Sequence, residues 1–357
     1  MSFILPIALA KNRKTYLTDF IFDNQIDGGF TNSLNSNDVS YQATANALEM
    51  LKFFDLYEEP QLFGDLKANV NVSVLQDDLK DELSNILGNN EPSIYDIFYL
   101  VKSIDLLNAS INSDQKNTIE QYISNAEQSG GGFGPTNVSQ SANLISTRYC
   151  LSILELIDSE TENEEGHKNF VLTCENSDGG FGGNASLDST IANTYYGLEV
   201  LDNLGGLDEI ADKEKTIEYL KDHYIDDEAD ENTYGGYLPD NEANYCLLSS
   251  TYYCIRSIFL LNEKKMTNET TADWVLSRQN FRDGGFVNFN GINDQEDSSV
   301  INTFYAFQIL KTFDEDLLYL NENVWMIEFN WIVLIVLLSI LGVVIALVIY
   351  YWQKRRF

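Results

Sequence analysis

Basic residues and histidines are scarce in this sequence. Its 357 residues include 22 Lys and Arg against 55 Asp and Glu, and the formal net charge is −33 at pH 7. A field of this sign repels nucleic-acid phosphates and anionic lipids, so we expect no nucleic-acid partner. His167 and His223 are the only imidazoles, which leaves few nitrogen ligands for zinc.

Cysteine is scarce too, and sequence patterns typical of strands are nearly absent. None of the four cysteines belongs to a Cys-x-x-Cys pair, and all fall inside helical patterns: Cys150, Cys174, Cys246 and Cys254. We expect them to be small buried apolar side chains, since a disulfide would require an oxidising compartment. No sustained alternation of apolar and polar residues is bounded by turn residues, and this predicts an all-α protein.

Two glycines followed by an aromatic residue recur along most of the chain. The five copies begin at Gly28, Gly131, Gly179, Gly235 and Gly284. They lie about 50 residues apart, except that the first gap is about twice as long, so it hides one unit without the glycines. The sequence therefore contains six repeat units.

Each unit contains two successive helical patterns. A single helical hairpin cannot bury its own apolar face, so such units must stack on one another. We predict a six-hairpin α/α toroid (an α6/α6 barrel) over residues 1–315, with the first helix of each unit outside and the more aromatic second helix inside. The predicted pairs are 3–23 and 40–55, 62–87 and 93–107, 114–128 and 139–157, 165–175 and 188–201, 208–224 and 243–261, and 270–281 and 298–313.

The repeat also resembles that of a known family. The pattern Gln-x-x-Asp-Gly-Gly-Phe, from Gln25 to Phe30, is similar to the repeat of protein prenyltransferase β subunits and squalene-type terpenoid cyclases. The resemblance covers residues 5–315, and it implies the same toroid with a central cavity. It further implies an apolar ligand, such as an isoprenoid, or a chain segment bound in that cavity.

The second helices share an aligned Thr-aromatic core that supplies the candidate ligand-binding residues. Packing accounts for most of these side chains, and the rest are expected to line an apolar cavity that has a few polar groups. Arg148 and Arg256 either bind one anionic group, such as a diphosphate, or pair with nearby carboxylates. The candidate lining residues are Ser146, Arg148, Tyr149, Asn193, Tyr195, Tyr196, Ser250, Tyr252, Tyr253, Arg256, Asn302, Phe304 and Tyr305.

The metal and acid motifs of the resembled enzymes are missing. In prenyltransferase β subunits a zinc-binding His directly precedes the repeated Thr, and an Asp-x-Cys stands four and two residues before it. The His positions hold Ser146, Asn193, Ser250 and Asn302, while the Asp-x-Cys positions hold Thr190 and Ala192 in unit four, and Ser299 and Ile301 in unit six. These residues cannot supply the soft ligands that zinc prefers, so we expect no zinc triad. The Asp-x-Asp-Asp acid of the cyclases is absent too.

Two oxygen-rich strings are the remaining alternatives for a metal. Residues 226–230 match the Asp-Asp-x-x-Asp pattern that holds magnesium in other terpene synthases, although a solvated acidic turn explains them better. Residues 288–297 could offer oxygens to calcium but lack EF-hand spacing. We therefore predict no cofactor. Catalytic residues stay unknown, and the sequence leaves open whether the protein is an enzyme.

The C-terminal part of the sequence predicts a membrane anchor. An acidic, Asn-rich linker spans residues 316–330, an apolar run spans 331–352, and a basic tail spans 353–357. The run is long enough to cross a hydrocarbon core of about 30 Å as a single helix. The basic tail favours a cytoplasmic C-terminus and an extracytoplasmic toroid, as five glycosylation sequons permit. A cytoplasmic, tail-anchored form stays open because no convincing signal peptide precedes the toroid.

These observations support two hypotheses of different classes. The first is a membrane-anchored prenyltransferase-like or terpenoid-cyclase-like toroid that binds an apolar ligand in its central cavity without the usual zinc triad. The alternative is a non-catalytic, surface-exposed protein that binds a protein, a glycan or a small ligand. The repeat favours the first hypothesis, whereas the missing motifs and the membrane anchor favour the second.

Overall fold

The computed structural model describes residues 11–57, 70–89, 91–139, 141–266, 269–289 and 296–324, together with positions 339, 342, 345 and 351. The chain divides into two compact units, Tyr16–Tyr319 and a smaller one that combines Met1–Thr15 with Leu320–Phe357. In the smaller unit, β1 (Lys11–Asn12) pairs antiparallel with β4 (Asn323–Val324). Arg13 forms an ion pair with Glu322 beside this pairing, at 2.8 Å.

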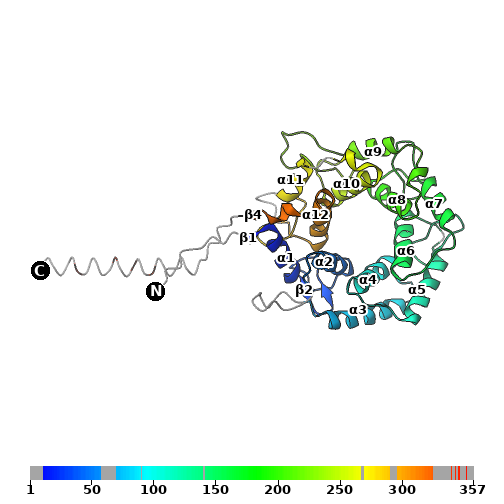
Figure 1. Cartoon of the computed structure of the whole chain (residues 1–357), viewed down its shortest axis with the longest axis horizontal. Helices are drawn as coiled ribbons and strands as arrows, with labels where there is room; N and C mark the ends of the chain where they lie inside the picture. The colour runs from blue at the N-terminus through cyan, green and yellow to red at the C-terminus, as the bar shows by residue number, and fades with distance from the viewer. Residues whose placement is uncertain are drawn as a thin grey trace. The chain divides into compact units, whose positions relative to one another are not determined.

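The larger unit is a ring of helical hairpins, and this confirms the α/α toroid (Figure 1). Each inner helix contacts the next, and the last contacts the first, so the ring is closed. The inner helices are α2 (Tyr41–Phe53), α4 (Ile94–Leu106), α6 (Leu144–Leu156), α8 (Ile191–Asn203), α10 (Leu248–Asn262) and α12 (Val300–Phe313). The outer helices are α1 (Arg13–Asp23), α3 (Val72–Leu87), α5 (Ser113–Ala126), α7 (Glu164–Thr173), α9 (Lys213–Lys221) and α11 (Glu269–Ser277).

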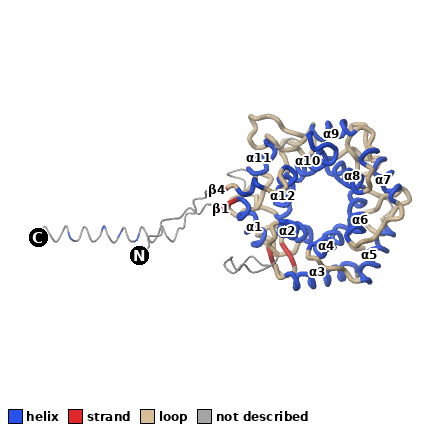
Figure 2. The backbone as a smooth tube through the Cα atoms, viewed as in Figure 1, coloured by secondary structure: helices blue, strands red, loops and turns tan. Residues whose placement is uncertain are grey.

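Strands are short in the described part of the chain, as the sequence predicts. In the larger unit β2 (Gln25–Ile26) pairs with β3 (Gly29–Phe30) across the first glycine turn. Single bridges replace this ladder in four later units, for example between Glu175 and Phe181. Figure 2 shows how little of the ring is strand. Short 3-10 helices occur at Leu207–Glu209, Glu263–Lys265 and Leu318–Asn321.

Several inner helices begin later than the sequence predicts. We expected starts at residues 139 and 188, whereas α6 begins at Leu144 and α8 at Ile191. The residue before each helix is an extended cap, Asn143 or Thr190, whose side chain accepts a hydrogen bond from a first-turn N–H, at 2.8 Å and 3.1 Å. The described residues just before these caps are not helical, a boundary that helical periodicity alone does not give.

A repeated threonine fixes each glycine turn to its inner helix. In unit four the Thr194 hydroxyl accepts a hydrogen bond from the Phe181 N–H at 3.0 Å and donates to the Thr190 carbonyl at 2.8 Å. Unit two has Ile97 at the equivalent position and also lacks the glycine turn. The same bond to the aromatic residue of the turn is made by Thr44, Thr147, Thr251 and Thr303.

The glycine turns also join neighbouring units. Gly179 has φ +92°, and a Cβ there would lie 2.7 Å from the Lys215 carbonyl oxygen of the next unit. A Cβ on Gly180 would lie 2.8 Å from the ring of Tyr219 in the same outer helix. Both glycines therefore allow a backbone approach that any side chain would block. This contact stacks unit four on unit five.

Several sequence predictions fall outside the described residues. These are the first part of the first predicted outer helix (3–10), residues 62–69, the sequon at 268, most of the oxygen-rich string at 290–295, residues 325–330 of the linker, nearly all of the apolar run 331–352, and the basic tail 353–357. Within the residues that the structure describes, no helix is long and apolar enough to cross a membrane. The anchor therefore stays a prediction.

Candidate binding cavity

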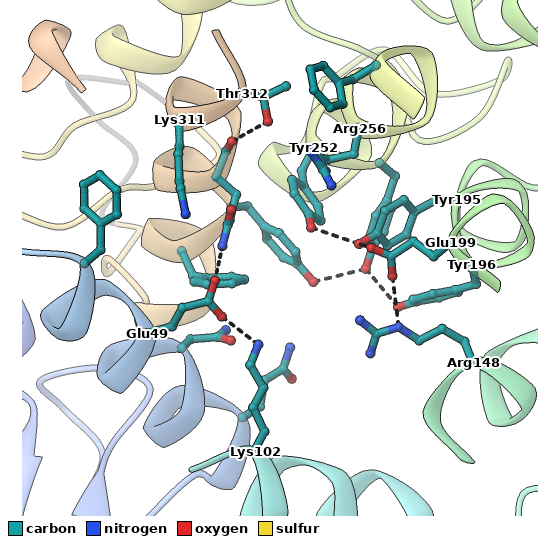
Figure 3. Close-up of a pocket in the computed structure, with 18 of the residues that line it drawn as sticks. Glu49, Lys102, Arg148, Tyr195, Tyr196, Glu199, Tyr252, Arg256, Lys311 and Thr312 are labelled. Carbon is teal, nitrogen blue, oxygen red and sulfur yellow. Dashed lines mark hydrogen bonds and ion pairs between the residues drawn. The ribbon is translucent and has the colours of Figure 1, made fainter. Parts of the chain in front are cut away.

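The inner helices enclose a cavity of about 920 Å³ in the larger unit (Figure 3). Its wall repeats from helix to helix, because most of the lining residues lie one, two or five positions after the repeated threonine or its equivalent Ile97. On α8 these are Tyr195, Tyr196 and Glu199. The exposed lining residues lie at or just after the C-terminal ends of inner helices, so the cavity opens at that end: Phe53, Glu263, Glu315 and Asp316.

Five tyrosines at one register form a belt across the cavity, called here the tyrosine belt. Their hydroxyls meet between neighbouring helices, at 3.1 Å for Tyr99 and Tyr149, 3.2 Å for Tyr196 and Tyr253, and 3.1 Å for Tyr253 and Tyr305. Burial raises the pKa of Tyr99, Tyr196, Tyr253 and Tyr305 above the usual range, so these hydroxyls are neutral. Because equivalent residues meet around the ring, the inner helices run in the same direction.

Charged side chains form a second level, and most of them stand three residues further along their helix than the belt position. The Lys102 ammonium lies 2.7 Å from the Glu49 carboxylate, and the Arg148 guanidinium lies 2.9 Å from Glu199 (Figure 3). Gln308 donates to Glu49 at 2.5 Å, which ties α12 to α2. Two of the cations that line the cavity are therefore already neutralised by carboxylates of the wall.

Arg148 is held by an ion pair and by two aromatic rings of the wall. Burial alone would lower the pKa of its guanidinium, but the Glu199 carboxylate and neighbouring tyrosines raise it above its usual value. The guanidinium lies over the rings of Phe98 and Tyr149, 4.9 Å and 5.1 Å from their centroids. Of the two roles that the sequence left open for Arg148, pairing with a carboxylate is the one that the structure contains.

Two further cations of the wall have no ion pair in the described part of the chain. Arg256 lies over the ring of Phe259 at 5.1 Å, and Lys311 lies over the ring of Phe53 at 4.9 Å. Both line the cavity, and they come from the neighbouring helices α10 and α12. The positive charge of the wall that no ion pair holds among the described residues therefore lies on this side, with the exposed carboxylates Glu263, Glu315 and Asp316 at the opening.

The comparisons with known proteins agree with this geometry. The sequence model of the prenyltransferase alpha-alpha toroid domain matches residues 66–165, 148–251 and 239–329, together more than half of the chain. The chain belongs to this family. Among curated proteins none matches the sequence of this prenyltransferase-family toroid.

Solved structures of low identity share the toroid fold. The protein geranylgeranyltransferase-I of Candida albicans, complexed with GGPP, has a TM-score of 0.56 and 13% identity over 85% of this chain and 85% of that one. The type II terpene cyclase MstE from Scytonema has a TM-score of 0.55 and 12% identity over 85% of this chain and 97% of its own. At such identities the likeness shows the fold alone, and it confirms the resemblance seen in the repeat.

Most of the predicted lining residues of this prenyltransferase-family toroid do line the cavity, but four do not. The wall includes Arg148, Tyr149, Tyr195, Tyr196, Tyr252, Tyr253, Arg256, Phe304 and Tyr305. The exceptions are Ser146, Asn193, Ser250 and Asn302, each three residues before a belt tyrosine. A helical side chain covers the turn N-terminal to its own Cα, so the belt lies between these four residues and the cavity. Whether any lining residue binds a ligand stays a prediction.

Three of the positions that the resemblance gives to the zinc site have structural roles in this prenyltransferase-family toroid. Thr190 and Ser299 cap α8 and α12, and the Ser250 hydroxyl donates to the Tyr237 carbonyl at 2.6 Å. Within the described residues, no group of three or more His, Cys, Asp or Glu is arranged to hold a metal ion. The string 226–230 is an exposed turn, in which Asp227 and Asp230 accept hydrogen bonds from nearby backbone N–H groups.

The histidines and cysteines serve the packing of the ring. His167 is fully buried, with its ring bonded to the Thr161 hydroxyl at 2.6 Å and to the Gly131 carbonyl. His223 bonds to the Tyr219 carbonyl at 3.0 Å. All four cysteines lie in described parts of the chain, where each is buried and free, in agreement with the prediction that they act as small apolar side chains.

Sequence reasoning missed the charged level of this prenyltransferase-family toroid. Glu49, Lys102, Glu199 and Lys311 line the cavity, yet none was a candidate. The first three stand five positions after the repeated threonine or Ile97, on the same face as the belt but one turn further along. Extending the alignment of the second helices by one turn would have identified them.

Proposed function

We propose that the central cavity binds a linear apolar ligand that carries one anionic group, with an isoprenoid diphosphate as the reference compound. The observation that carries this proposal is the pair of unneutralised cations, Arg256 and Lys311, beside an aromatic wall. Family membership supports the isoprenoid class, and the reference ligand is the kind named for the Candida albicans relative. We propose that the cavity binds this ligand, and we propose no catalytic step.

The aromatic wall suits an apolar chain. A volume of about 920 Å³ lies within the range of about 300–1,000 Å³ that is usual for small-molecule sites. The rings of Tyr195 and Tyr253 stack with centroids 4.9 Å apart, and Phe304 adds an apolar face from α12. Burying alkenyl groups against such rings contributes roughly 25 cal/mol per Å² of apolar area removed from water. The chain end of the ligand is therefore expected beside the tyrosine belt.

The charged level determines where the anionic group binds. Lys102 and Arg148 are held by Glu49 and Glu199, so an entering anion would have to displace a carboxylate to reach them. Arg256 and Lys311 present no such competitor within the described residues. A phosphate group accepts charge-assisted hydrogen bonds from both a guanidinium and an ammonium. We therefore place the anionic group between α10 and α12.

Calorimetric titration of the full chain in detergent tests this proposal. The ligands are geranylgeranyl diphosphate, geranylgeraniol and inorganic diphosphate, and the variants are Arg256→Met combined with Lys311→Met, with the exposed Lys52→Met as the matched control. We expect the diphosphate to bind at least about tenfold more tightly than the alcohol, with this preference lost in the double variant only. Absence of binding by both isoprenoids would refute the apolar site, whereas an unchanged preference in the double variant would refute the anion site.

We also propose that residues 331–352 anchor the toroid to a membrane as a single-pass protein. The support is the uncharged apolar run, which is long enough to span, and the basic residues that follow it. The basic tail favours an extracytoplasmic toroid. External protease added to intact cells should then remove the toroid and leave the tail protected. A protein released by carbonate washing would contradict the anchor, and a toroid degraded only after lysis would favour the tail-anchored form.

A further inference from the structure

The connections that precede the inner helices lie together on one face of the ring, called here the turn face. The inner helices run in the same direction, so their N-terminal ends share this face. The connections also contact one another: the Asn35 amide donates to Asp297 at 2.7 Å, and the Tyr245 and Phe289 rings lie 5.7 Å apart. In each unit the connection or the first turn of the helix carries at least one large apolar side chain that is 36–60% exposed, such as Leu34, Tyr95, Val138, Leu187, Tyr245 and Phe289.

The turn face is predominantly acidic, with Arg282 as an exposed exception. In the sequence that joins each outer helix to its inner helix, Arg278 and Arg282 are the only Lys or Arg. Arg278 is 2% exposed, so it contributes little to the surface. Acidic residues occur in every one of these connections, from Asp27 in unit one to Asp297 in unit six. A face of this kind repels anionic lipids and a second copy of itself, and it attracts a basic partner.

A pocket of about 380 Å³ opens on this face between units four and five. One wall comes from the connection before α8 and contains Asp178 and Asp188. The other wall contains Asp240 and the buried His223, which is 3% exposed. The pocket is separate from the central cavity, since the two share no lining residue.

The polar groups of this pocket are mostly hydrogen-bond acceptors. The Asn176 amide donates both its hydrogens, to the Leu187 carbonyl at 3.0 Å and to the Ser189 hydroxyl at 3.1 Å, so its oxygen is left as an acceptor. The Ser189 hydroxyl in turn donates to Asp178 at 2.7 Å. Because Nδ1 of His223 donates to the Tyr219 carbonyl, Nε2 of the neutral ring is an acceptor, and no hydrogen bond to it occurs among the described residues. A lysine or arginine side chain, which only donates, complements such a lining.

We propose that this pocket is a docking site for a partner protein that inserts a lysine or arginine side chain flanked by apolar residues. The cation would bond to the Asp188 carboxylate and to Nε2 of His223. The flanking residues would pack on Leu187 and Tyr245, which are 52% and 41% exposed and belong to the two connections that form the pocket. A sugar fits less well, since its hydroxyls need donors as well as acceptors.

Isothermal titration of the full chain with two synthetic peptides tests the site. The probes are acetyl-Leu-Lys-Leu-amide and acetyl-Leu-Gln-Leu-amide, which differ only in the cation. The pocket variants are Asp188→Asn and Leu187→Ser. The matched controls, Glu91→Gln and Val138→Ser, remove the same kinds of group from the turn face away from the pocket. Thermal unfolding of each variant, compared with the unmodified chain, shows whether it folds.

We expect the lysine peptide to bind about tenfold more tightly than the glutamine peptide, as one charge-assisted hydrogen bond predicts. Each pocket variant should lower the affinity for the lysine peptide severalfold, while the control variants should leave this affinity within about twofold of the unmodified chain. Equal affinity for the two peptides would refute a cation site. Equally weakened peptide binding in the pocket and control variants would show that the turn face as a whole, and not this pocket, attracts the peptide, and would refute the site. If the full chain dimerises and Leu187→Ser abolishes the dimer, the turn face binds a second copy of the chain, and the proposal is overturned.

Discussion

The second glycine of the last turn packs against the first helix of the ring. A Cβ on Gly285 would lie 2.7 Å from the ring of Phe20, a side chain that is fully buried on α1. Three of the four equivalent glycines meet an aromatic side chain of the following unit in the same way: Gly132 with Phe170, Gly180 with Tyr219, and Gly236 with Trp274. The contact that stacks neighbouring units therefore also closes the ring.

Replacing Gly285 by alanine should destabilise the toroid. The added methyl forces the Phe20 ring to shift inside a packed core, which costs about 1–3 kcal/mol of unfolding free energy. Urea denaturation followed by circular dichroism measures this loss. Gly130→Ala is the matched control, because a Cβ there would have no neighbour within 4 Å, and its effect should stay within about 0.5 kcal/mol. Similar losses in both variants would contradict a role for this contact in ring closure.

Thr194→Val should destabilise unit four without removing much apolar packing. The substitution leaves the Phe181 N–H without its hydroxyl acceptor in a fully buried position, at a cost of about 1–3 kcal/mol. Thr173→Val is the control, since that hydroxyl bonds to the Phe170 carbonyl on an exposed surface. Hydrogen exchange should also show faster exchange at Phe181 in the Thr194 variant. A protected Phe181 amide would mean that another acceptor replaces the threonine.

The repeat predicted the ring well, because each glycine turn is a local structure with its own sequence signal. Two glycines, an aromatic residue and a threonine mark where a unit docks, and unit two shows that the threonine and the turn are lost together. The helix starts were predicted less well. The connection before Asn143 reads Ser-Gln-Ser-Ala, which contains no glycine or proline to interrupt a helical pattern, so only the cap separates the two.

The candidate site could be predicted only in part. The aromatic residues of the inner helices follow directly from the alignment, and those one and two positions after the threonine line the cavity. The positions of Ser146 and Asn193 depend on which side chain covers them, and a helical pattern does not give this. The pairing of Glu49 with Lys102 joins inner helices of two consecutive units, so it depends on how neighbouring units stack.

The native cysteines should be unreactive toward DTNB at pH 8. Burial raises the pKa of Cys174 to about 11 and that of Cys246 to about 12, so both thiols are protonated at this pH. All four should react once the chain is unfolded in guanidinium. Ser186→Cys places a thiol at an exposed position, and it serves as the positive control. Rapid reaction of the unmodified native chain would contradict the burial of these side chains.

The ion pair between Arg148 and Glu199 should contribute more to the free energy of unfolding than an exposed ion pair of similar N–O distance. Its side chains are 20% and 19% exposed, whereas those of Lys265 and Glu214, 2.8 Å apart, are 43% and 59% exposed. In double-mutant cycles with Arg148→Met and Glu199→Gln, we expect a coupling of about 1–2 kcal/mol, against about 0.5 kcal/mol or less for the exposed pair. Added salt should reduce the exposed coupling more, because the cavity pair is less screened.

The same variants separate this pair from the proposed anion site. Since Glu199 already neutralises Arg148, Arg148→Met should lower stability but leave the preference for geranylgeranyl diphosphate over the alcohol nearly unchanged. Glu199→Gln frees the guanidinium inside the cavity, and we expect it to strengthen diphosphate binding severalfold because a third cation becomes available. Calorimetric titration of both variants measures this. A diphosphate preference lost in Arg148→Met would show that the anion displaces Glu199, and would move the anion site from α10 and α12 to α6.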